Sequence, residues 1–267
     1  MTTFHRLHDG PALLVLPNAW DAGSARLFES LGARAIATTS AGLAWSRGYP
    51  DGNSLPNDQL IAATRDIARV IGVPLSMDIE EGYSNDEHTV ARLAAAVLNA
   101  GAAGINIEDG AGSPDRLCRK IAAIRDSTSR SGGDLFVNAR TDVYLRGIAT
   151  GNAALDEVID RAARYRAAGS DGLFVPGLID GNAMTAIAAA IHPMPLNIMA
   201  APGLPSMDAL QTAGIRRLSA GSAIAQAGWG RTGSLAAAFL EGDVSELFGA
   251  AAEYGKMNAL FARNNTA

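Results

Sequence analysis

Short apolar segments alternate with Ala-rich segments of helical periodicity along the chain, and this alternation constrains the fold more than any other feature. The stretches 86–101 and 155–169 repeat apolar residues at three- and four-residue steps, and the second ends on Gly169, a common residue at helix C-termini. Strands that alternate with helices form parallel sheets, and eight such units close a (β/α)8 or TIM barrel. We therefore predict this α/β barrel, with strands at residues 12–19, 33–40, 74–80, 104–109, 135–140, 172–177, 196–200 and 215–221.

An open, doubly wound sheet is the alternative arrangement of the same elements. No Gly-x-Gly-x-x-Gly motif follows the first expected strand, so a dinucleotide-binding sheet is only weakly supported. No linker or low-complexity segment interrupts the 267 residues. We expect a single domain over residues 1–267, with the barrel at about 12–228 and C-terminal helices at about 229–265. Stretches 233–248 and 251–262 carry apolar faces beyond what a closed barrel needs, so we expect them to pack on another subunit.

The charge balance argues against two classes of partner. The chain has 22 Lys and Arg against 27 Asp and Glu and contains no basic run, so binding to nucleic acid, which requires neutralisation of phosphates, is not expected. No apolar run approaches the ~20 residues of a membrane span, and the N-terminus lacks the apolar core of a signal peptide. The single cysteine, Cys118, cannot form an internal disulfide, which fits the reducing cytoplasm. A small-molecule partner is expected instead.

Acidic side chains gather where the third and fourth expected strands end, and an arginine stands where the fifth ends. Side chains at the carboxyl ends of barrel strands form the active site. Asp78, Glu80 and Glu108 would converge there, and carboxylates that share a site raise one another's pKa unless a cation is present. Oxygen ligands favour Mg²⁺ or Mn²⁺, and Arg140 could bind a substrate carboxylate through two N–H groups.

A purely structural explanation of the acids is that they cap helices or pair with arginines. We favour that explanation for Glu81 and Asp109, and a functional one for Asp78.

Residue types that are absent from the strand ends narrow the chemistry. Neither lysine, Lys120 or Lys256, falls at a strand end, which disfavours a Schiff-base aldolase. The four histidines also avoid the strand ends, which argues against a histidine-ligated zinc site and a Ser-His-Asp triad. Cys118 lies in a helical pattern and is expected to be packed. The remaining acids, arginine, hydroxyls and amides suit a metal held against an oxo acid, with stabilisation of an enolate.

Six motifs in register give a resemblance to a known family. They are "TTSAG", "YPDG", "MDIEEGYS", "GAAGINIED", "NARTDVY" and "LNIMAAPG", spread between Leu14 and Gly228. In this order they resemble the isocitrate lyase/phosphoenolpyruvate mutase superfamily. The resemblance implies a Mg²⁺-dependent TIM barrel that makes or breaks C–C or P–C bonds in small 2-oxo acids through a metal-stabilised enolate. It also implies a homotetramer in which a C-terminal helix is swapped between subunits.

The resemblance also implies roles for individual residues. The metal would be bound by Asp78, with Glu80 and Glu108 holding its water ligands, although many members have Asp where Glu80 stands. The substrate-binding set would be Ser40, Ala41, Gly42, Arg140 and Asn197. The catalytic set would be Asp51, on a loop over the site, Arg140 and Glu108.

The chain departs from the family in its acid–base residues. Lyases of the family carry Lys-x-Cys-Gly after the fourth strand and mutases carry Lys-x-Asn-Ser, whereas this chain reads "GAGSPDRLC". Where mutases show a histidine after the sixth strand, it has Val175-Pro176-Gly177. A decarboxylase, hydrolase or lyase for an untypical 2-oxo acid therefore stays open, as does a non-catalytic or degenerate member that binds an oxo acid. The proton donors that remain are water, Tyr49, Asp51, Tyr83 and Tyr144.

A phosphate-binding barrel enzyme is a further alternative. The stretch "SAGSAIAQAG" after the eighth strand could hold phosphate on backbone amides at a helix start. We favour a tight turn with a serine cap for this stretch.

Overall fold

The computed structural model describes residues 3–130, 132–249 and 251–262, and within them nine parallel strands form one sheet in the order β1-β9-β8-β7-β6-β5-β4-β3-β2. The strands are β1 (Leu14–Leu16), β2 (Asn18–Ala19), β3 (Ile36–Thr38), β4 (Leu75–Asp78), β5 (Gly104–Glu108), β6 (Phe136–Arg140), β7 (Gly172–Val175), β8 (Leu196–Met199) and β9 (Ile215–Ser219). Each of the eight predicted strands is present, shorter than the sequence pattern suggested.

The first predicted strand is divided in two by Pro17, which has no N–H to donate to the sheet. Its first part, β1, pairs with β9, and its second part, β2, pairs with β3. The pairing continues around the proline, because Pro17 O accepts a hydrogen bond from Ala37 N at 3.2 Å. The broken strand thus joins the two ends of the sheet, and the predicted TIM barrel is confirmed.

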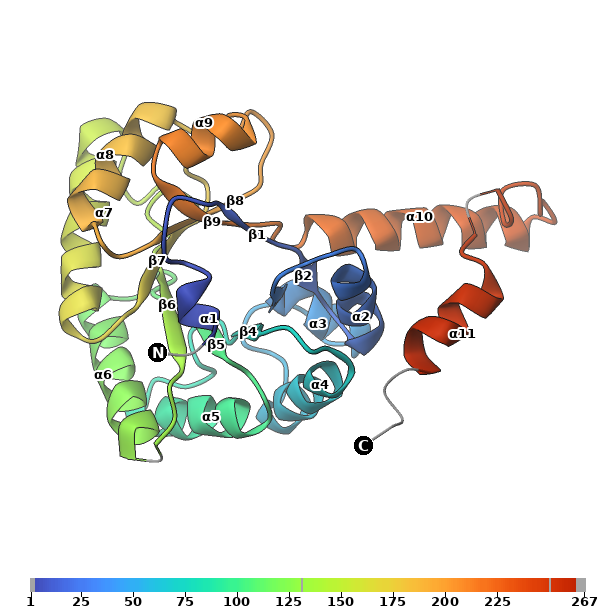
Figure 1. Ribbon diagram of the computed structural model, residues 1–267, viewed down its shortest axis with the longest axis horizontal. Coiled ribbons are helices and arrows are strands. Elements are labelled where there is room, and N and C mark those ends of the chain that lie inside the picture. Colours follow the sequence, from blue (N-terminus) through green and yellow to red (C-terminus); the bar gives the residue numbers. More distant parts are fainter. Residues whose placement is uncertain (1–2, 131, 250, 263–267) are drawn as a thin grey trace.

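Helices surround the sheet and form the outer layer of the barrel, as Figure 1 shows. The stretches 86–101 and 155–169, which have helical periodicity, correspond to helices that end at Asn99 and Ala167, and Cys118 also lies in a helix. The helices are α1 (Thr3–Arg6), α2 (Ala22–Ser30), α3 (Ser40–Ser46), α4 (Asn57–Val70), α5 (Glu87–Asn99), α6 (Pro114–Arg130), α7 (Gly151–Ala167), α8 (Gly181–Ile191), α9 (Met207–Thr212), α10 (Ala223–Leu240) and α11 (Tyr254–Ala262).

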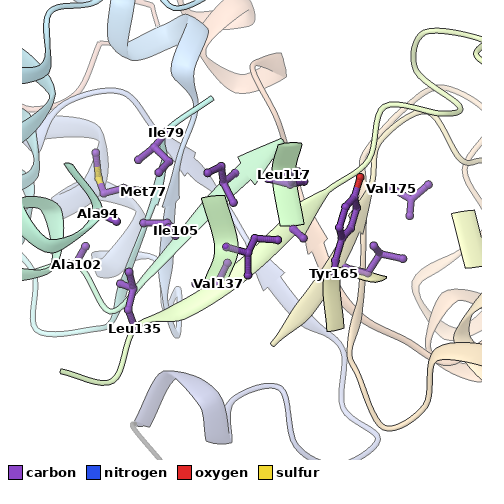
Figure 2. Packing of buried hydrophobic residues seen from close by; sticks show 14 of the residues in the cluster. Met77, Ile79, Ala94, Ala102, Ile105, Leu117, Leu135, Val137, Tyr165 and Val175 are labelled. Atoms are coloured by element: carbon purple, nitrogen blue, oxygen red, sulfur yellow. The ribbon is translucent and has the colours of Figure 1, made fainter. Parts of the chain in front are cut away.

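The main apolar core lies between the sheet and the helices (Figure 2). Side chains alternate between the two faces of a strand. Met77 and Ile105 therefore face outward and belong to the same buried cluster as Leu117 of α6. The residues next to them, Ser76 and Asn106, face the barrel interior, where both contact the same arginine. The barrel thus has an apolar outer layer and a polar interior.

The N-terminal end of the barrel is filled by α1, which lies inside the ring of strands in Figure 1. Phe4 of α1 is fully buried, and its ring centre lies 5.3 Å from that of Phe136. The two rings form a small cluster with Leu14, Leu16, Ala35 and Ala37. This plug leaves the opposite end of the barrel, where the strands have their carboxyl ends, as the place for a site.

The C-terminal tail leaves the barrel. α10 projects away from it and α11 turns back toward α2, where Arg26 Nε donates to Leu260 O at 3.0 Å. Several large apolar side chains of the tail are exposed, among them Leu240 at 84% and Phe248 at 79%. The tail was predicted to be helical to about residue 265, and its last three residues lie outside the described part. In the described residues no helix is both long and apolar enough to cross a membrane.

Candidate active site

Three predicted site residues stand at the carboxyl ends of neighbouring strands. Asp78 ends β4, Glu108 ends β5 and Arg140 ends β6. The register of β5 and β6 places Glu108 and Arg140 side by side. They form an ion pair with 2.6 Å between Arg140 Nη1 and Glu108 Oε2. The parallel topology thus brings together an arginine and two carboxylates that lie far apart in the sequence.

The guanidinium of Arg140 is held from behind by Asp142, whose side chain is fully buried. Arg140 Nε and Nη2 donate to the two carboxylate oxygens of Asp142 at 2.7 and 3.2 Å. Burial opposes the charge on Arg140, but Glu108 and Asp142 outweigh it and raise the pKa of Arg140. A guanidinium has five N–H groups, so these contacts leave one N–H on each Nη atom. Arg140 is thereby oriented to bind a carboxylate with two parallel hydrogen bonds.

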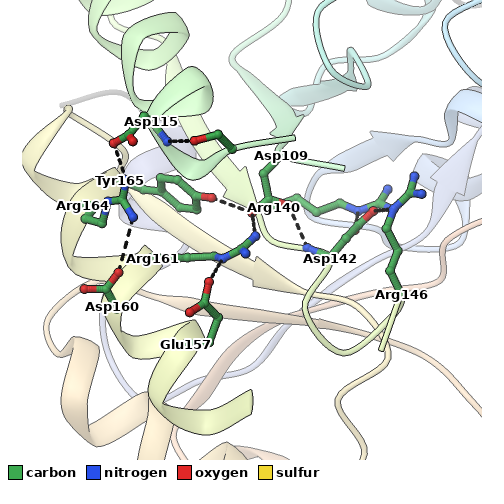
Figure 3. Close-up of polar contacts among 11 residues, drawn as sticks. Asp109, Asp115, Arg140, Asp142, Arg146, Glu157, Asp160, Arg161, Arg164 and Tyr165 are labelled. Carbon is green, nitrogen blue, oxygen red and sulfur yellow. Dashed lines mark hydrogen bonds and ion pairs between the residues drawn. The ribbon is translucent and has the colours of Figure 1, made fainter. Parts of the chain in front are cut away.

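Asp109 lies behind the site and connects it to α7, as Figure 3 shows. Its Oδ1 accepts from the backbone N of Asp142 at 2.9 Å. Its Oδ2 accepts from Arg161 Nη1 at 2.8 Å and from the Tyr165 hydroxyl at 2.5 Å. Burial and Asp109 together raise the pKa of Tyr165, which keeps its hydroxyl a donor. Asp109 is therefore engaged in structural contacts, in line with the structural explanation favoured for it.

Asp78 points into the site and touches the segment after β3. Its Oδ2 accepts from Ser40 N at 3.3 Å, and its Oδ1 accepts from Glu80 N at 3.2 Å. Burial raises the pKa of Asp78, and the charge of Arg140 opposes the shift.

The segment after β3 is tightly packed. Ala41 and Gly42 follow Ser40 at the start of α3 and are buried. A Cβ on Gly42 would lie 2.8 Å from Thr39 Cγ2 and 3.0 Å from Trp20 Cβ, so only glycine fits there. The three predicted substrate-binding residues 40–42 therefore form one fixed edge of the site, against Asp78.

Glu80 connects the loop after β4 with the loop after α3. Its Oε1 accepts from the Tyr83 hydroxyl at 2.9 Å, and its Oε2 accepts from Asn53 N. Glu80, Tyr83 and Asn53 all have positive φ angles, of 49°, 56° and 58°. Such strain at non-glycine residues concentrates at functional sites. Burial is the main cause that raises the pKa of Asp78 and of Glu80. The charge of the nearby, exposed Asp51 adds a smaller upward shift to both.

Lys120 supports the same loop from below, which sequence reasoning missed. This lysine of α6 is only 2% exposed, and its Nζ donates to Glu81 O at 2.6 Å. Burial lowers the pKa of Lys120. Its helical pattern gave no sign of this contact, because the partner is 39 residues away in the sequence.

The site contains more acidic than basic side chains. Burial raises the pKa of Glu108 to about 8; Arg140 opposes this shift, and Asp78 adds to it. Among the described residues, no three carboxylate, histidine or cysteine side chains are grouped closely enough to bind a metal directly. The donors fit a hard divalent ion bound by Asp78 and, through water, by Glu80 and Glu108, because oxygen ligands suit Mg²⁺ and Mg²⁺ usually keeps several waters. Such an ion would in turn favour the charged forms of these carboxyl groups, whose pKa values burial raises.

Asn197 lies deeper in the barrel than the other predicted residues. Its Oδ1 accepts from Asn138 Nδ2 at 3.0 Å, and its Nδ2 donates to Ser219 Oγ at 2.9 Å and Ile198 O at 2.7 Å. These contacts occupy its amide, so a direct role in substrate binding stays a prediction.

The turn after β9 has little room for phosphate on its backbone. Asn18 Oδ1 accepts from the N–H groups of Ala220 and Gly221 at 2.7 and 3.0 Å. Ser222 precedes α10, but its side chain makes no capping hydrogen bond. The tight turn favoured from the sequence is present, and asparagine rather than serine holds it.

Fold and site together define a (β/α)8 barrel with an acidic, arginine-containing centre at the carboxyl ends of its strands. The chain belongs to the phosphoenolpyruvate phosphomutase family, whose model matches residues 4–240. An uncharacterized protein of Mycobacterium tuberculosis is 38% identical over 231 residues, which cover 85% of this chain and 84% of that protein. The 2-methylisocitrate lyase of Bacillus subtilis is 30% identical over 72% of this chain and 64% of that enzyme. The predicted superfamily and the lyase or mutase class of enzyme are confirmed.

Solved structures agree over nearly the whole chain. A lyase/mutase-type protein of Burkholderia cenocepacia J2315 superposes with a TM-score of 0.87 at 34% identity, over 97% of this chain and 94% of that chain. Oxaloacetate acetylhydrolase in complex with the product oxalate gives 0.83 at 25% identity, over 96% and 92%. Phosphonopyruvate hydrolase in complex with oxalate and Mg²⁺ gives 0.83 at 22% identity, over 96% and 93%, which supports the fold alone.

Proposed function

We propose that this protein is a Mg²⁺- or Mn²⁺-dependent lyase-type enzyme that breaks or forms a C–C or P–C bond beside the carbonyl of a small 2-oxo acid. The observation that carries the proposal is the pairing of Arg140 with Glu108 at the strand end next to the buried Asp78. This arrangement offers an anion-binding group and a cation-binding group at one end of the barrel. A 2-oxo acid held by a divalent ion needs both.

Substrate binding falls to Arg140 and to the segment at residues 40–42. The two remaining N–H groups on the Nη atoms of Arg140 match the two oxygens of a carboxylate. Asp142 fixes the guanidinium plane, and the fixed edge formed by Ser40 and Gly42 limits the size of the molecule that fits. The complex of oxaloacetate acetylhydrolase with oxalate supports a small dicarboxylate or 2-oxo acid as the ligand.

The carboxylates would hold the divalent ion. A bound ion would act as a Lewis acid and stabilise the negative charge that develops on the carbonyl oxygen. Asp78 would bind it directly, while Glu80 and Glu108 would accept hydrogen bonds from its water ligands. Burial is the main cause of the raised pKa values of these three carboxyl groups, with a smaller contribution from repulsion among them. They support this assignment, because a cation would stabilise the charged forms.

Bond cleavage leaves the electron pair of the broken bond on the oxo acid as an enolate, which then takes a proton at carbon. The other fragment leaves as CO₂, as a carbonyl compound that has lost its hydroxyl proton to solvent, or, from a P–C bond, as phosphate formed with water. Tyr83 is a poor candidate donor, because its hydroxyl donates to Glu80 at 2.9 Å and because burial and Glu80 raise its pKa. Asp51 is exposed on the loop whose Asn53 is bound by the same glutamate. We assign closure of the site to the loop that carries Asp51, and the candidate proton donors that remain are water, Tyr49, Asp51 and Tyr144.

A turnover assay on a panel of 2-oxo acids and their hydroxy-acid adducts tests this function. With Mg²⁺ present we expect release of pyruvate, oxalate or CO₂ from at least one member, and no release after chelation of the metal. No turnover of any member, combined with binding of oxalate, would favour the non-catalytic alternative. That alternative draws on one observation, the absence of the Lys-x-Cys-Gly motif before α6.

A further inference from the structure

Arg217 of β9 is the largest fully buried side chain among the described residues. It lies inside the barrel, where its Nη2 donates to Asn106 Oδ1 at 3.2 Å and Ser76 Oγ at 3.4 Å. Its guanidinium carbon lies 5.9 Å from the centre of the Phe4 ring. Its Nε and Nη1 have no hydrogen-bond partner in the described part of the chain. A full positive charge is therefore buried without a carboxylate bonded to it.

The charge lies beneath the site. Ser76 lies two residues before Asp78 on β4, and Asn106 lies two residues before Glu108 on β5. All four side chains therefore face the barrel interior, in two successive layers. Burial lowers the pKa of Arg217 to about 9, while the interaction with Asp78 opposes this shift and favours the charged guanidinium. Arg217 thus stays a cation at neutral pH and interacts with Asp78 from the floor of the site.

The fold does not need this charge. Burying an ion without a bonded counter-charge costs free energy, and apolar residues of similar volume often replace buried ionic groups without loss of stability. Phe4, Leu14 and Leu16 already line the lower end of the barrel with apolar atoms. A residue that lowers stability in such a place points to a gain in function.

We propose that Arg217 is a positioning residue that acts through its fixed charge: it weakens binding of a divalent ion alone and strengthens binding of the anionic ligand. The divalent ion and the oxo acid would then bind together rather than the ion by itself. The inference rests on the proposed function, because it assumes that the site takes a divalent ion and an anion. Beyond that function, the inference says that Arg217, without contacting the ion or the anion, sets their relative affinities for the site.

Titration calorimetry with Mn²⁺ and with oxalate tests the inference on Arg217→Met, Arg217→Gln and Arg217→Lys. For the two uncharged variants we expect Mn²⁺ alone to bind about tenfold more tightly and oxalate, at saturating Mn²⁺, about tenfold more weakly, a change within the usual range of coupling between sites. Arg217→Met should also raise the melting temperature of the metal-free protein. Arg217→Lys keeps the charge and should change both affinities much less.

Arg216→Met is the matched control. It removes the same charge from the preceding residue of β9. The half-buried side chain of Arg216 donates to the backbone O of Ile215 at 3.1 Å. We expect both affinities to stay close to those of the parent.

The outcomes separate the two proposals. If the parent binds both ligands but the uncharged Arg217 variants weaken both or change neither, Arg217 has only a structural role and the inference is overturned. If the parent binds neither Mn²⁺ nor oxalate, the proposed function fails, and the inference fails with it. Opposite changes for the two ligands support the inference, since general damage to the fold cannot tighten one of them.

Discussion

The backbone N–H of Asp142 donates to Asp109 Oδ1 at 2.9 Å, and this bond ties the carboxyl ends of β5 and β6 together. Asp142 in turn holds Arg140, so the position of the guanidinium proposed to bind the substrate depends indirectly on the Asp109 carboxylate. Arg161 and Tyr165 of α7 hold that carboxylate in place. A helix of the outer layer thus contributes to the geometry of the site.

Removal of one hydroxyl should test this connection. Tyr165→Phe deletes a buried hydrogen bond to a charged group, which typically contributes about 1.5–3 kcal/mol. We expect the free energy of unfolding, measured with urea, to fall by roughly that amount and oxalate binding to weaken. Tyr254→Phe, at a tyrosine that is 82% exposed, is the control and should change neither. Unchanged stability in Tyr165→Phe would mean that the hydroxyl of Tyr165 contributes little.

The reaction should tolerate loss of the only cysteine. Cys118 is half-buried on α6, and burial raises its pKa, so it is a poor acid at the site. We expect Cys118→Ser to keep turnover within a few-fold, whereas Arg140→Ala should lower it by at least about a hundredfold by removing charge stabilisation. If Cys118→Ser were folded and as inactive as Arg140→Ala, the short loop before α6 would serve as the gate of the cysteine-dependent lyases.

Stability should respond to pH in a way that the metal reverses. The pKa of Glu108 is raised from 4.5 to about 8, mainly by burial, so the folded protein holds a proton that the unfolded chain has lost between these values. The stabilisation is complete below about pH 4.5 and is lost as the pH rises through about 8. We expect the melting temperature of the metal-free protein to fall between about pH 6 and 8, and Mg²⁺ to bind more tightly over the same range.

Glu108→Gln provides the control for the pH response, because an amide cannot ionise. Its melting temperature should depend less on pH in the metal-free state. An equally steep fall in this variant would assign the response to other groups, with Asp78 and Glu80 the first candidates.

The assembly should be a homotetramer in which α10 packs on a neighbouring subunit. A groove of about 510 Å³ lies beside β1, between α2 and α9, and includes the exposed Val15, Leu31 and Met207. The tail carries exposed Phe239 and Leu240, which would cover such a surface. We expect light scattering to give a mass near four chains of 27.5 kDa, and Leu240→Asp to lower it. A mass near one chain at micromolar concentration would contradict the tetramer.

The fold could be predicted from the sequence because its signals are local. Helical periodicity and short apolar strands mark most elements, although not the short helices α1 and α3. A parallel barrel then fixes which residues share its carboxyl-terminal face. That is why Asp78, Glu108 and Arg140 could be grouped before their distances were known. The division of the first strand at Pro17 was not predicted. In the sequence, a proline that divides a strand cannot be distinguished from one that ends it.

The contacts that orient the site could not be predicted in this way. Lys120 meets Glu81 across 39 residues and Arg217 meets Asn106 across 111, and no local pattern encodes such pairs. The alternation along β9 could have signalled Arg217, because two adjacent arginines in a strand, at 216 and 217, must point to opposite faces. One of them had to enter the barrel.

The central claim is that Asp78 holds a divalent ion that, with Arg140, binds a small oxo acid or dicarboxylate. Calorimetric titration of oxalate into the parent and Asp78→Asn, each with and without Mg²⁺, tests it most directly, with Glu81→Gln as a neighbouring control. The account predicts that oxalate binds to the parent and to Glu81→Gln only when Mg²⁺ is present, and that Asp78→Asn does not bind it under either condition. Equal binding of oxalate without Mg²⁺, or undiminished Mg²⁺-dependent binding in Asp78→Asn, would contradict the account.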